Sequence, residues 1–297
     1  MPIPGLTGFF PETGYIVYDS PSYVDVNVFN DLGGFFYSSV TIVVENTTTV
    51  SSSDATIAAM DLTGFGPGVA FRILLDGHIR GAGGLGGSGW QWYIDASVTL
   101  STQGQGGGGA GSVPGAGGVS IWPESPSLPA QPGTEEIGGL KGFRQLTNRA
   151  PPFYPNPTPP PSLIYPPDPP WPVPAYRALI APLGPTGQAG GTALLALPSH
   201  EVTVELVGTL WGGGGGGIGG DAGGDAPNPP GNLALPNEDT SDGTDGGGAG
   251  LPGDPYPLGG TGPPASPAEP GAAGYALKGT SIYTITGGGN KRGQEGL

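Results

Sequence analysis

The sequence HEVTVELVGTLWGGGGGGIGG, residues 200–220, decides how this chain folds. Its first part alternates apolar and polar side chains, which predicts a β-strand with one buried face. The strand runs without a break into a tract made almost wholly of glycine. Glycine loses more backbone entropy on ordering than any other residue, so such a tract is either disordered or packed in a way that only glycine permits. We expect the packed arrangement.

The same pattern occurs earlier in the chain. Residues 71–84 read FRILLDGHIRGAGG and residues 202–215 read VTVELVGTLWGGGG, so the two windows align at a constant offset of 131 residues, from 71 to 202. Apolar positions of the first strand match those of the second, and glycines match glycines. A flexible linker has no reason to keep that alignment, whereas self-similarity at a fixed spacing is typical of a repeated structural unit. We therefore predict two copies of a strand that leads into a glycine lattice.

Composition bears on whether the chain is folded. Its 61 Gly and 37 Pro make about one third of the 297 residues, a share typical of low-complexity or disordered chains. Yet 36% of the residues are hydrophobic, and the chain contains 5 Trp, 11 Tyr and 9 Phe, whereas disordered chains are poor in aromatic residues. A collagen helix is excluded because glycine does not recur at every third position over any long stretch. We expect a folded, extended protein in which backbone packing replaces much of the side-chain core.

Polyglycine II helices would supply that packing. This conformation is a left-handed helix with about three residues per turn, related to polyproline II. Without side chains, parallel rods come close enough for N–H to O=C bonds between rods, helped by weak Cα–H to O contacts, and every buried backbone group needs such a partner. A bulky residue inside the lattice would force the rods apart. The predicted fold class is all-β with polyglycine II helices and essentially no α-helix.

The pattern of strands, glycine and proline divides the chain into regions. Residues 23–30 (YVDVNVFN) and 40–50 (VTIVVENTTTV) read as strands joined at Gly33 and Gly34, which predicts a small antiparallel β domain. The predicted regions are the N-terminal β domain at 1–62, a first strand-plus-rod module at 63–142, a proline-rich extended linker at 143–189 and a second module at 190–297.

The linker contains 13 Pro within residues 151–174. Such a run is extended and semi-rigid, at about 3.1 Å per residue. It reads as a spacer whose aromatic residues lie on neighbouring surface; the alternative is a ligand for a polyproline-binding domain.

Charge and cysteine content exclude several classes of function. The net charge of −15 leaves no basic patch to neutralise phosphates, which argues against nucleic-acid binding and favours solubility. The absence of Cys excludes disulfide frameworks, thiol catalysis and Cys-based zinc sites. No stretch has the length of a transmembrane helix, and MPIPGLTGFF lacks the features of a signal peptide. If the protein works outside a cell, we expect it to arrive there by assembly or lysis.

The C-terminal region carries a resemblance to a known class of protein. The pattern Gly271-Ala272-Ala273-Gly274-Tyr275-Ala276, the alternating segment 281–286 and Arg292-Gly293 follow the strand and glycine run. Together they resemble the glycine-rich C-terminal regions of tailed-bacteriophage tail fibres, tail-tip proteins and adhesins, over about half of the chain. Residues 1–62 and the proline tract do not share the resemblance.

The resemblance implies a structural protein of a virion, located at the tail tip or fibre and extracellular. In that family, sandwiched glycine helices display variable loops that touch the host surface. The implied partners are other phage tail proteins and a host surface receptor, either a polysaccharide or an outer-membrane protein. A homotrimer and a monomer are both compatible with it. For the N-terminal region 1–62, which lies outside the resemblance, we predict attachment to the virion.

Loops on a rigid scaffold carry recognition, so the connections between glycine rods are the candidate receptor-binding regions. In the second module these are residues 227–239 and 253–270, which offer amide groups and an aromatic face; in the first module an equivalent interruption carries a tryptophan. For any one residue, a loop that merely turns the chain is an equal alternative. The candidate receptor-binding residues are Trp122, Asn228, Asn232, Asn237 and Tyr256.

Motifs for cofactors and metals are weak. Gly81-x-Gly83-x-x-Gly86 matches a dinucleotide fingerprint, but GGSG followed by WQWYID cannot supply the helix that the fingerprint needs. Acidic residues at 238–245 could gather oxygen ligands for Ca²⁺, although their spacing misses the EF-hand pattern and a solvated acidic loop is the favoured interpretation. We predict no cofactor and no metal site, and leave Ca²⁺ binding by the acidic loops open.

Catalytic motifs are weak as well. His78 and His200, the two histidines, lie in or beside predicted strands, where a structural or exposed role is favoured over that of a general base. Ser88 in GGSGW lacks the final glycine of a nucleophile elbow. Asp221 and Asp225 could pair for sugar cleavage, but no aromatic-lined cleft is evident nearby in sequence. We expect no catalytic residue and a protein that is not an enzyme.

The sequence thus favours a phage tail-tip or fibre protein that recognises the host surface non-enzymatically. The main rival is a purely structural virion component, such as a tail collar, spike or capsid decoration protein. A bacterial surface or matrix protein is a third class.

Overall fold

The structure is a computed structural model, and it describes residues 13–87, 90–94, 104–105, 107–117, 130–140, 142–143, 175–179, 187–217, 246–254 and 269–297.

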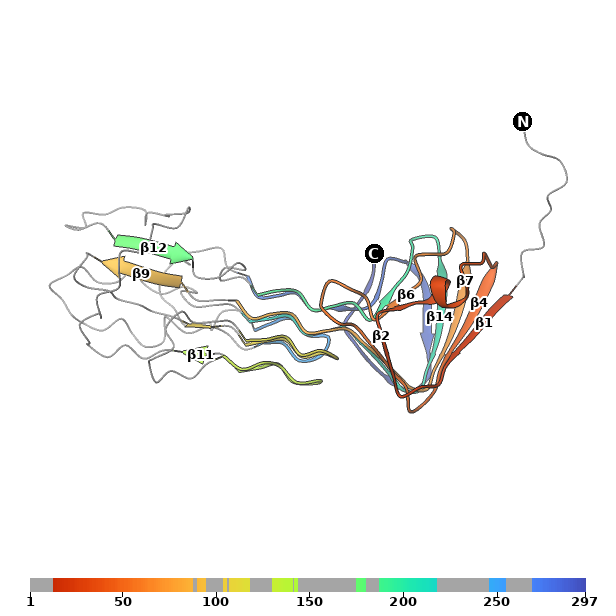
Figure 1. The fold of residues 1–297 in the computed structure, drawn as a ribbon, viewed down its shortest axis with the longest axis horizontal. Coiled ribbons are helices and arrows are strands. Elements are labelled where there is room, and N and C mark those ends of the chain that lie inside the picture. The colour runs from red at the N-terminus through yellow and green to blue at the C-terminus, as the bar shows by residue number, and fades with distance from the viewer. Residues whose placement is uncertain are drawn as a thin grey trace, which may run out of the picture.

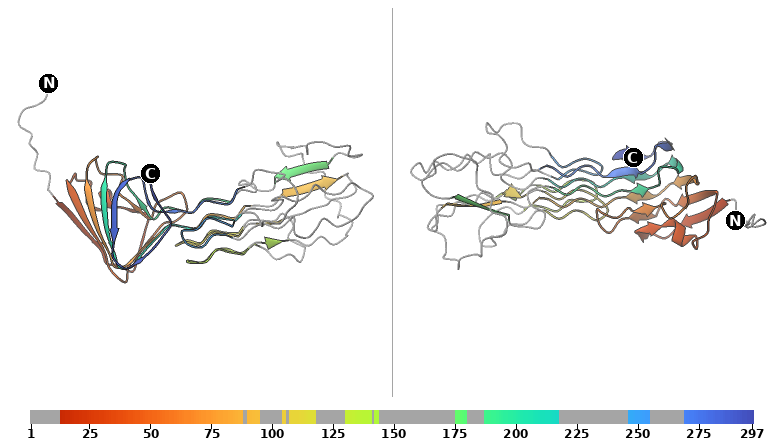
Figure 2. Two further views of the ribbon diagram at one scale, coloured as in Figure 1. Left: turned by 180° about the vertical axis from the view of Figure 1, so that it is seen from behind. Right: turned by 90° about the horizontal axis from the view of Figure 1, so that it is seen from above.

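A parallel β-solenoid forms one part of the molecule. The chain passes through three five-stranded sheets in turn and returns to the first, so each coil adds one strand to every sheet. In Figure 1 the first two sheets form the sides of a wedge and β6 lies across its open end; Figure 2 shows the coils stacked in chain order. The first sheet consists of β1 (Thr13–Tyr18), β4 (Ser39–Val44), β7 (Ala70–Leu75), β14 (Glu201–Leu206) and β17 (Ile282–Thr286).

The other two sheets have shorter strands in the same order. The second sheet consists of β2 (Ser22–Val24), β5 (Thr49–Ser51), β8 (His78–Arg80), β15 (Thr209–Trp211) and β18 (Asn290–Arg292). The third consists of β3 (Val26–Asn27), β6 (Met60–Asp61), β13 (Leu194–Leu195), β16 (Tyr275–Lys278) and β19 (Gln294–Gly296).

Apolar side chains fill the solenoid as continuous columns, because the parallel strands pair in register. Ile42, Ile73 and Val204 are neighbours in the first sheet, and all three are fully buried. The other sheets add the columns Val50–Ile79–Leu210 and Met60–Leu194–Leu277. The two similar stretches of sequence are therefore neighbouring coils, paired at the offset that aligns Ile73 with Val204.

The expectation of an all-β chain with essentially no α-helix is confirmed for the described residues. Their one helix is α1 (Val28–Asp31), a single turn whose N-cap Asn27 accepts a hydrogen bond from the amide of Asn30. Partly buried side chains at and after α1, among them Phe29, Leu32 and Tyr37, pack against the solenoid core. Gly33 and Gly34 follow in the left-handed region and turn the chain toward β4.

The prediction of an antiparallel N-terminal domain is wrong. β1 and β2 pair parallel with β4 and β5, and β4 pairs with β7, so residues 13–62 share their sheets with the rest of the chain. The stretch predicted as one strand at 23–30 turns a corner at Asp25, whose φ of 52° ends β2, and finishes in α1. Alternating side chains identify a strand but carry no information about its partner's direction.

Two charged side chains stand at the C-terminal end of the solenoid's apolar columns. In the last coil, Lys291 pairs beside Leu210 and Glu295 beside Leu277, so both occupy positions that are apolar in the preceding coils. Lys291 and Glu295 form an ion pair with each other. The core column in the second and third sheets therefore ends in a polar cap.

Two long excursions leave the solenoid at the same corner. Residues 81–191 lie between β8 and β13, and residues 212–274 lie between β15 and β16. Their glycine-rich segments run side by side away from the solenoid (Figures 1 and 2). Within the first excursion, β9 (Trp90–Ile94) pairs antiparallel with β12 (Ala175–Leu179), and β10 (Gly104–Gln105) with β11 (Gly142–Phe143).

Candidate functional site

The excursions build a bundle of glycine-rich segments held together by backbone hydrogen bonds. None of these segments is a helix or a strand of a sheet. In chain order they are residues 81–87, 107–110, 113–117, 130–133, 138–140, 187–191, 212–217, 246–249, 251–254 and 269–274, and we call this set the bundle.

The segment 212–217 lies at the centre of one half of the bundle. Its amides donate to neighbouring segments with a repeat of three residues, so that every third amide meets the same neighbour. The amides of Gly213 and Gly216 donate to 187–191, those of Gly214 and Gly217 to 107–110, and that of Gly215 to 251–254.

Carbonyl groups of the same segment accept from another set of neighbours. The donors belong to 81–87, 246–249 and 269–274, which with the three accepting segments gives six neighbours around one. The segment 107–110 is surrounded in the same way. It donates to 130–133, 81–87 and 246–249, and it accepts from 212–217, 113–117 and 138–140. The ten segments thus form two overlapping hexagonal groups, and both groups contain 81–87, 107–110, 212–217 and 246–249.

Side chains are excluded from the interior of the bundle by backbone atoms. A Cβ added at any glycine from 212 to 216 would come closer than 3.0 Å to backbone atoms of a neighbouring segment. The larger side chains of the bundle, such as Leu85, Leu140 and Leu251, are instead exposed. Buried amides and carbonyls meet one another in place of a side-chain core.

The connections between segments gather at two ends. Turns at 111–113, 134–137 and 249–251 lie beside the solenoid; the amide of Ser112, for example, donates to the carbonyl of Gly81. At the far end, Gly87 donates to Gly217, and Gly217 donates to Gly107. The bundle segments that border residues 88–106, 118–129, 141–186, 218–245 and 255–268 therefore have their ends at that far end, and we call these five stretches the far-end connections.

The predicted receptor-binding residues belong to three of these far-end connections. Trp122 lies within 118–129, Tyr256 within 255–268, and Asn228, Asn232 and Asn237 within 218–245, all outside the described residues. Ser88, Asp221, Asp225, the acidic residues 238–245 and the proline tract 151–174 also lie outside them. In the described part of the chain, no group of three His, Asp or Glu side chains is arranged to hold a metal ion.

His200 is a buried side chain bonded to the backbone. Its Nδ1 accepts from the amide of Leu197 at 3.2 Å, and its Nε2 lies 3.1 Å from the carbonyl oxygen of Gly66. The neutral tautomer with a proton on Nε2 satisfies both contacts. Burial lowers the pKa of His200, an effect opposed in part by the backbone hydrogen bonds. These contacts give the ring a structural role between β13 and β14.

His78 lies on the outer face of the second sheet. Its Nδ1 is 2.9 Å from the hydroxyl of Thr209 on the next coil. Desolvation and the nearby Arg80 lower its pKa. No carboxylate of the described residues is hydrogen-bonded to either histidine.

The glycines of the dinucleotide fingerprint donate backbone hydrogen bonds to other parts of the protein. Gly83 and Gly86 donate to the carbonyls of Val113 and Ala116, and Gly81 donates to that of Trp211. No helix begins at this segment, which is described from 81 to 87. The amides that would cradle a pyrophosphate are therefore engaged with protein backbone.

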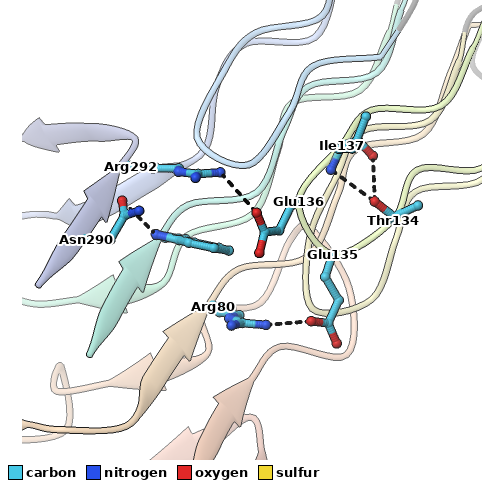
Figure 3. Close-up of polar contacts among 8 residues, drawn as sticks. Arg80, Thr134, Glu135, Glu136, Ile137, Asn290 and Arg292 are labelled. Atoms are coloured by element: carbon cyan, nitrogen blue, oxygen red, sulfur yellow. Dashed lines mark hydrogen bonds and ion pairs between the residues drawn. The ribbon is translucent and has the colours of Figure 1, made fainter.

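A cluster of charged and aromatic side chains lies where the bundle meets the solenoid (Figure 3). Trp211 pairs beside Arg80 on one side and Arg292 on the other, and the guanidinium carbons lie 4.8 Å and 4.3 Å from the centre of its ring. Its Nε1 donates to Asn290 Oδ1 at 3.3 Å. The indole also packs against Ala110 and Ala249 of the bundle.

We call Arg80, Trp211, Arg292, Glu135 and Glu136 the root cluster. Glu135 and Glu136 belong to the turn at 134–137 and form ion pairs with Arg80 and Arg292 respectively. Sequence reasoning missed this cluster. The available signal was that Arg80, Trp211 and Arg292 each directly precede a glycine, at the same corner of successive coils.

No helix in the described part of the chain has the length and apolar character needed to cross a membrane. Comparison with known protein families, with curated proteins and with solved structures finds no match to this chain.

Proposed function

We propose that the glycine-rich segments are polyglycine II helices. The support is the three-residue repeat of bonding partners along 212–217, since a helix with about three residues per turn presents every third amide to the same neighbour. Six neighbours around one segment agree with the close packing that side-chain-free rods allow. The proposed bundle is a stiff scaffold that does not depend on a conventional apolar core.

We further propose that the protein is a phage tail-tip or fibre protein that recognises the host cell surface without catalysing a reaction. One observation carries this proposal: backbone hydrogen bonds bring segments of both excursions together, so that the ends that border the far-end connections lie at one end of the bundle, remote from the solenoid. A rigid scaffold that presents several loops together is suited to binding. The proposed contacts are made by Trp122, Asn228, Asn232, Asn237 and Tyr256.

The proposed location is the virion, at an extracellular tail tip or fibre. The receptor is a polysaccharide or an outer-membrane protein, and the other partners are phage tail proteins, with a homotrimer as one assembly state to test. Attachment to the particle is assigned to residues 1–62. In support, the first coils carry exposed apolar side chains away from the far end of the bundle, namely Tyr15, Val24 and Phe35.

The test is adsorption of fluorescently labelled protein to a panel of bacterial strains. We expect it to coat susceptible cells, and we expect the double substitution Tyr256→Ala and Asn237→Ala to lower adsorption without lowering the thermal midpoint. Glu205→Gln, on the outer face of the solenoid, is the matched control and should adsorb like the parent. Unchanged adsorption of the double variant would remove these loops from the site.

The rival function, a purely structural virion component, gives the opposite result in the same assay. Free protein would then coat no strain, while an antibody to it would still label phage particles. A bacterial surface or matrix protein would be found on cells that carry no phage.

A further inference from the structure

The turn at 134–137 is fastened to the solenoid by two ion pairs. Glu135 Oε2 lies 2.6 Å from Arg80 Nη1, and Glu136 Oε2 lies 3.8 Å from Arg292 Nη1 (Figure 3). The turn is internally rigid, because Thr134 and Ile137 exchange hydrogen bonds through the Thr134 hydroxyl and both backbones. It therefore places the backbone of Glu135 and Glu136 in one defined position beside the two arginines.

The basic side of this contact depends on its acidic partner. The Arg80 side chain is only 13% exposed, and its Nε is buried without a hydrogen-bond partner. Glu135 and the indole of Trp211 are what stabilise the charge of that guanidinium. Neutralising Glu135 would leave a largely buried cation with only the indole beside it.

Overall charge makes this corner distinctive. The chain carries nine Lys and Arg against 24 Asp and Glu, so cations that can pair with the two adjacent carboxylates of the turn are few. Two of those nine cations, Arg80 and Arg292, form ion pairs with this turn at the root cluster. They come from β8 and from β18, and so the contact links the beginning of the first excursion to the last coil.

We infer that the turn at 134–137 is an electrostatic strap that holds the outer segments 130–133 and 138–140 against the solenoid and opens as ionic strength rises. The strap closes only when β18 has added Arg292, so its closure requires the complete solenoid. The central segments 107–110 and 212–217 do not depend on it, since each is hydrogen-bonded to six neighbouring segments, whereas 130–133 and 138–140 are each bonded to three.

Amide hydrogen exchange of the full chain tests the strap. In the double variant Glu135→Gln and Glu136→Gln, which keeps side-chain size, amides of residues 133–140 should exchange roughly tenfold faster, while those of 202–206 and 213–217 keep their protection. In the parent, 1 M NaCl should accelerate the same amides of 133–140, because the Debye length there is only about 3 Å. In the double variant, 1 M NaCl should increase the exchange rate of these amides little further.

The matched control is Glu205→Gln, which removes the exposed Arg72–Glu205 ion pair from the solenoid face and should leave residues 133–140 unchanged. The strap is overturned if the double variant and the parent exchange alike at 133–140. It is also overturned if salt accelerates both equally, or if protection is lost throughout the solenoid.

Discussion

Gly213 lies against the carbonyl oxygen of Ala82 so closely that a Cβ on Gly213 would overlap that oxygen. The two residues come from different excursions. Neither backbone can move without breaking hydrogen bonds to a further segment, since the amide of Gly213 donates to Gly191 and the amide of Gly191 donates to the carbonyl of Ala82. The close approach therefore makes stability sensitive to a single methyl group.

Gly213→Ala is expected to lower the free energy of unfolding by at least about 2 kcal/mol, because overpacking here displaces backbone and not a flexible side chain. Urea denaturation measures it. The matched control is Gly66→Ala, where an added Cβ meets nothing within 4 Å. Equal stabilities of the two variants would contradict the packing described for the bundle.

Amides at the centre of the bundle should be as protected as those of the solenoid. We expect Gly213–Gly217 to exchange as slowly as β14, because each donates to a carbonyl group of a neighbouring segment. The exposed residue Gly288, in the turn before β18, serves as the unprotected comparison. Fast exchange across 213–217 would show that the bundle is not formed in solution.

Stability should decline as the pH falls below about 6.5, the ordinary pKa of histidine. Because burial lowers the pKa of His200, the unfolded chain binds more protons than the folded one in the window below 6.5, and stability rises with pH across that window. His78 acts in the same direction. Urea denaturation between pH 7 and pH 5 should give a shallower slope for His200→Gln than for the parent; an identical slope would exclude this residue as the cause.

Trp211→Ala should lower the free energy of unfolding by about 3–5 kcal/mol, the usual cost of removing a buried aromatic side chain. The indole is 4% exposed and separates two guanidinium groups, so its loss leaves a cavity and brings like charges together. Trp211→Phe should cost less, since it keeps a ring between the cations and loses only the bond to Asn290. A smaller loss for the alanine variant than for the phenylalanine variant would contradict this account.

Part of the fold could be predicted from the sequence because it depends on local pattern. Alternation between 202 and 206 identified β14, and the shared offset of 131 residues matches the pairing of Val204 with Ile73. The spacing between β1 and β4 is shorter than that between β7 and β14, because only the later coils carry excursions. The sequence therefore does not show one repeat length shared by all coils. Because the alternation continues across the corner at Asp25, β2 and β3 resemble a single strand.

The root cluster could not be predicted for a related reason. Its members lie at positions 80, 135, 136, 211 and 292, and only the solenoid register brings them together. Trp211 and the two arginines each stand before a glycine, but nothing local points to Glu135 and Glu136. The receptor-binding assignment to Trp122, Asn228, Asn232, Asn237 and Tyr256 stays a prediction.

The ion pair between Lys291 and Glu295 bears on how many copies can join end to end. Parallel coils offer unpaired backbone groups at their last strand, which in principle invites another chain to continue the sheets. Here an incoming coil would have to bury an ammonium and a carboxylate where the earlier coils supply Leu, Ile, Val, Met or Tyr. Pairing of a second copy with this edge would therefore leave two charged groups between apolar coils, which disfavours end-to-end continuation of the sheets at β18 and β19.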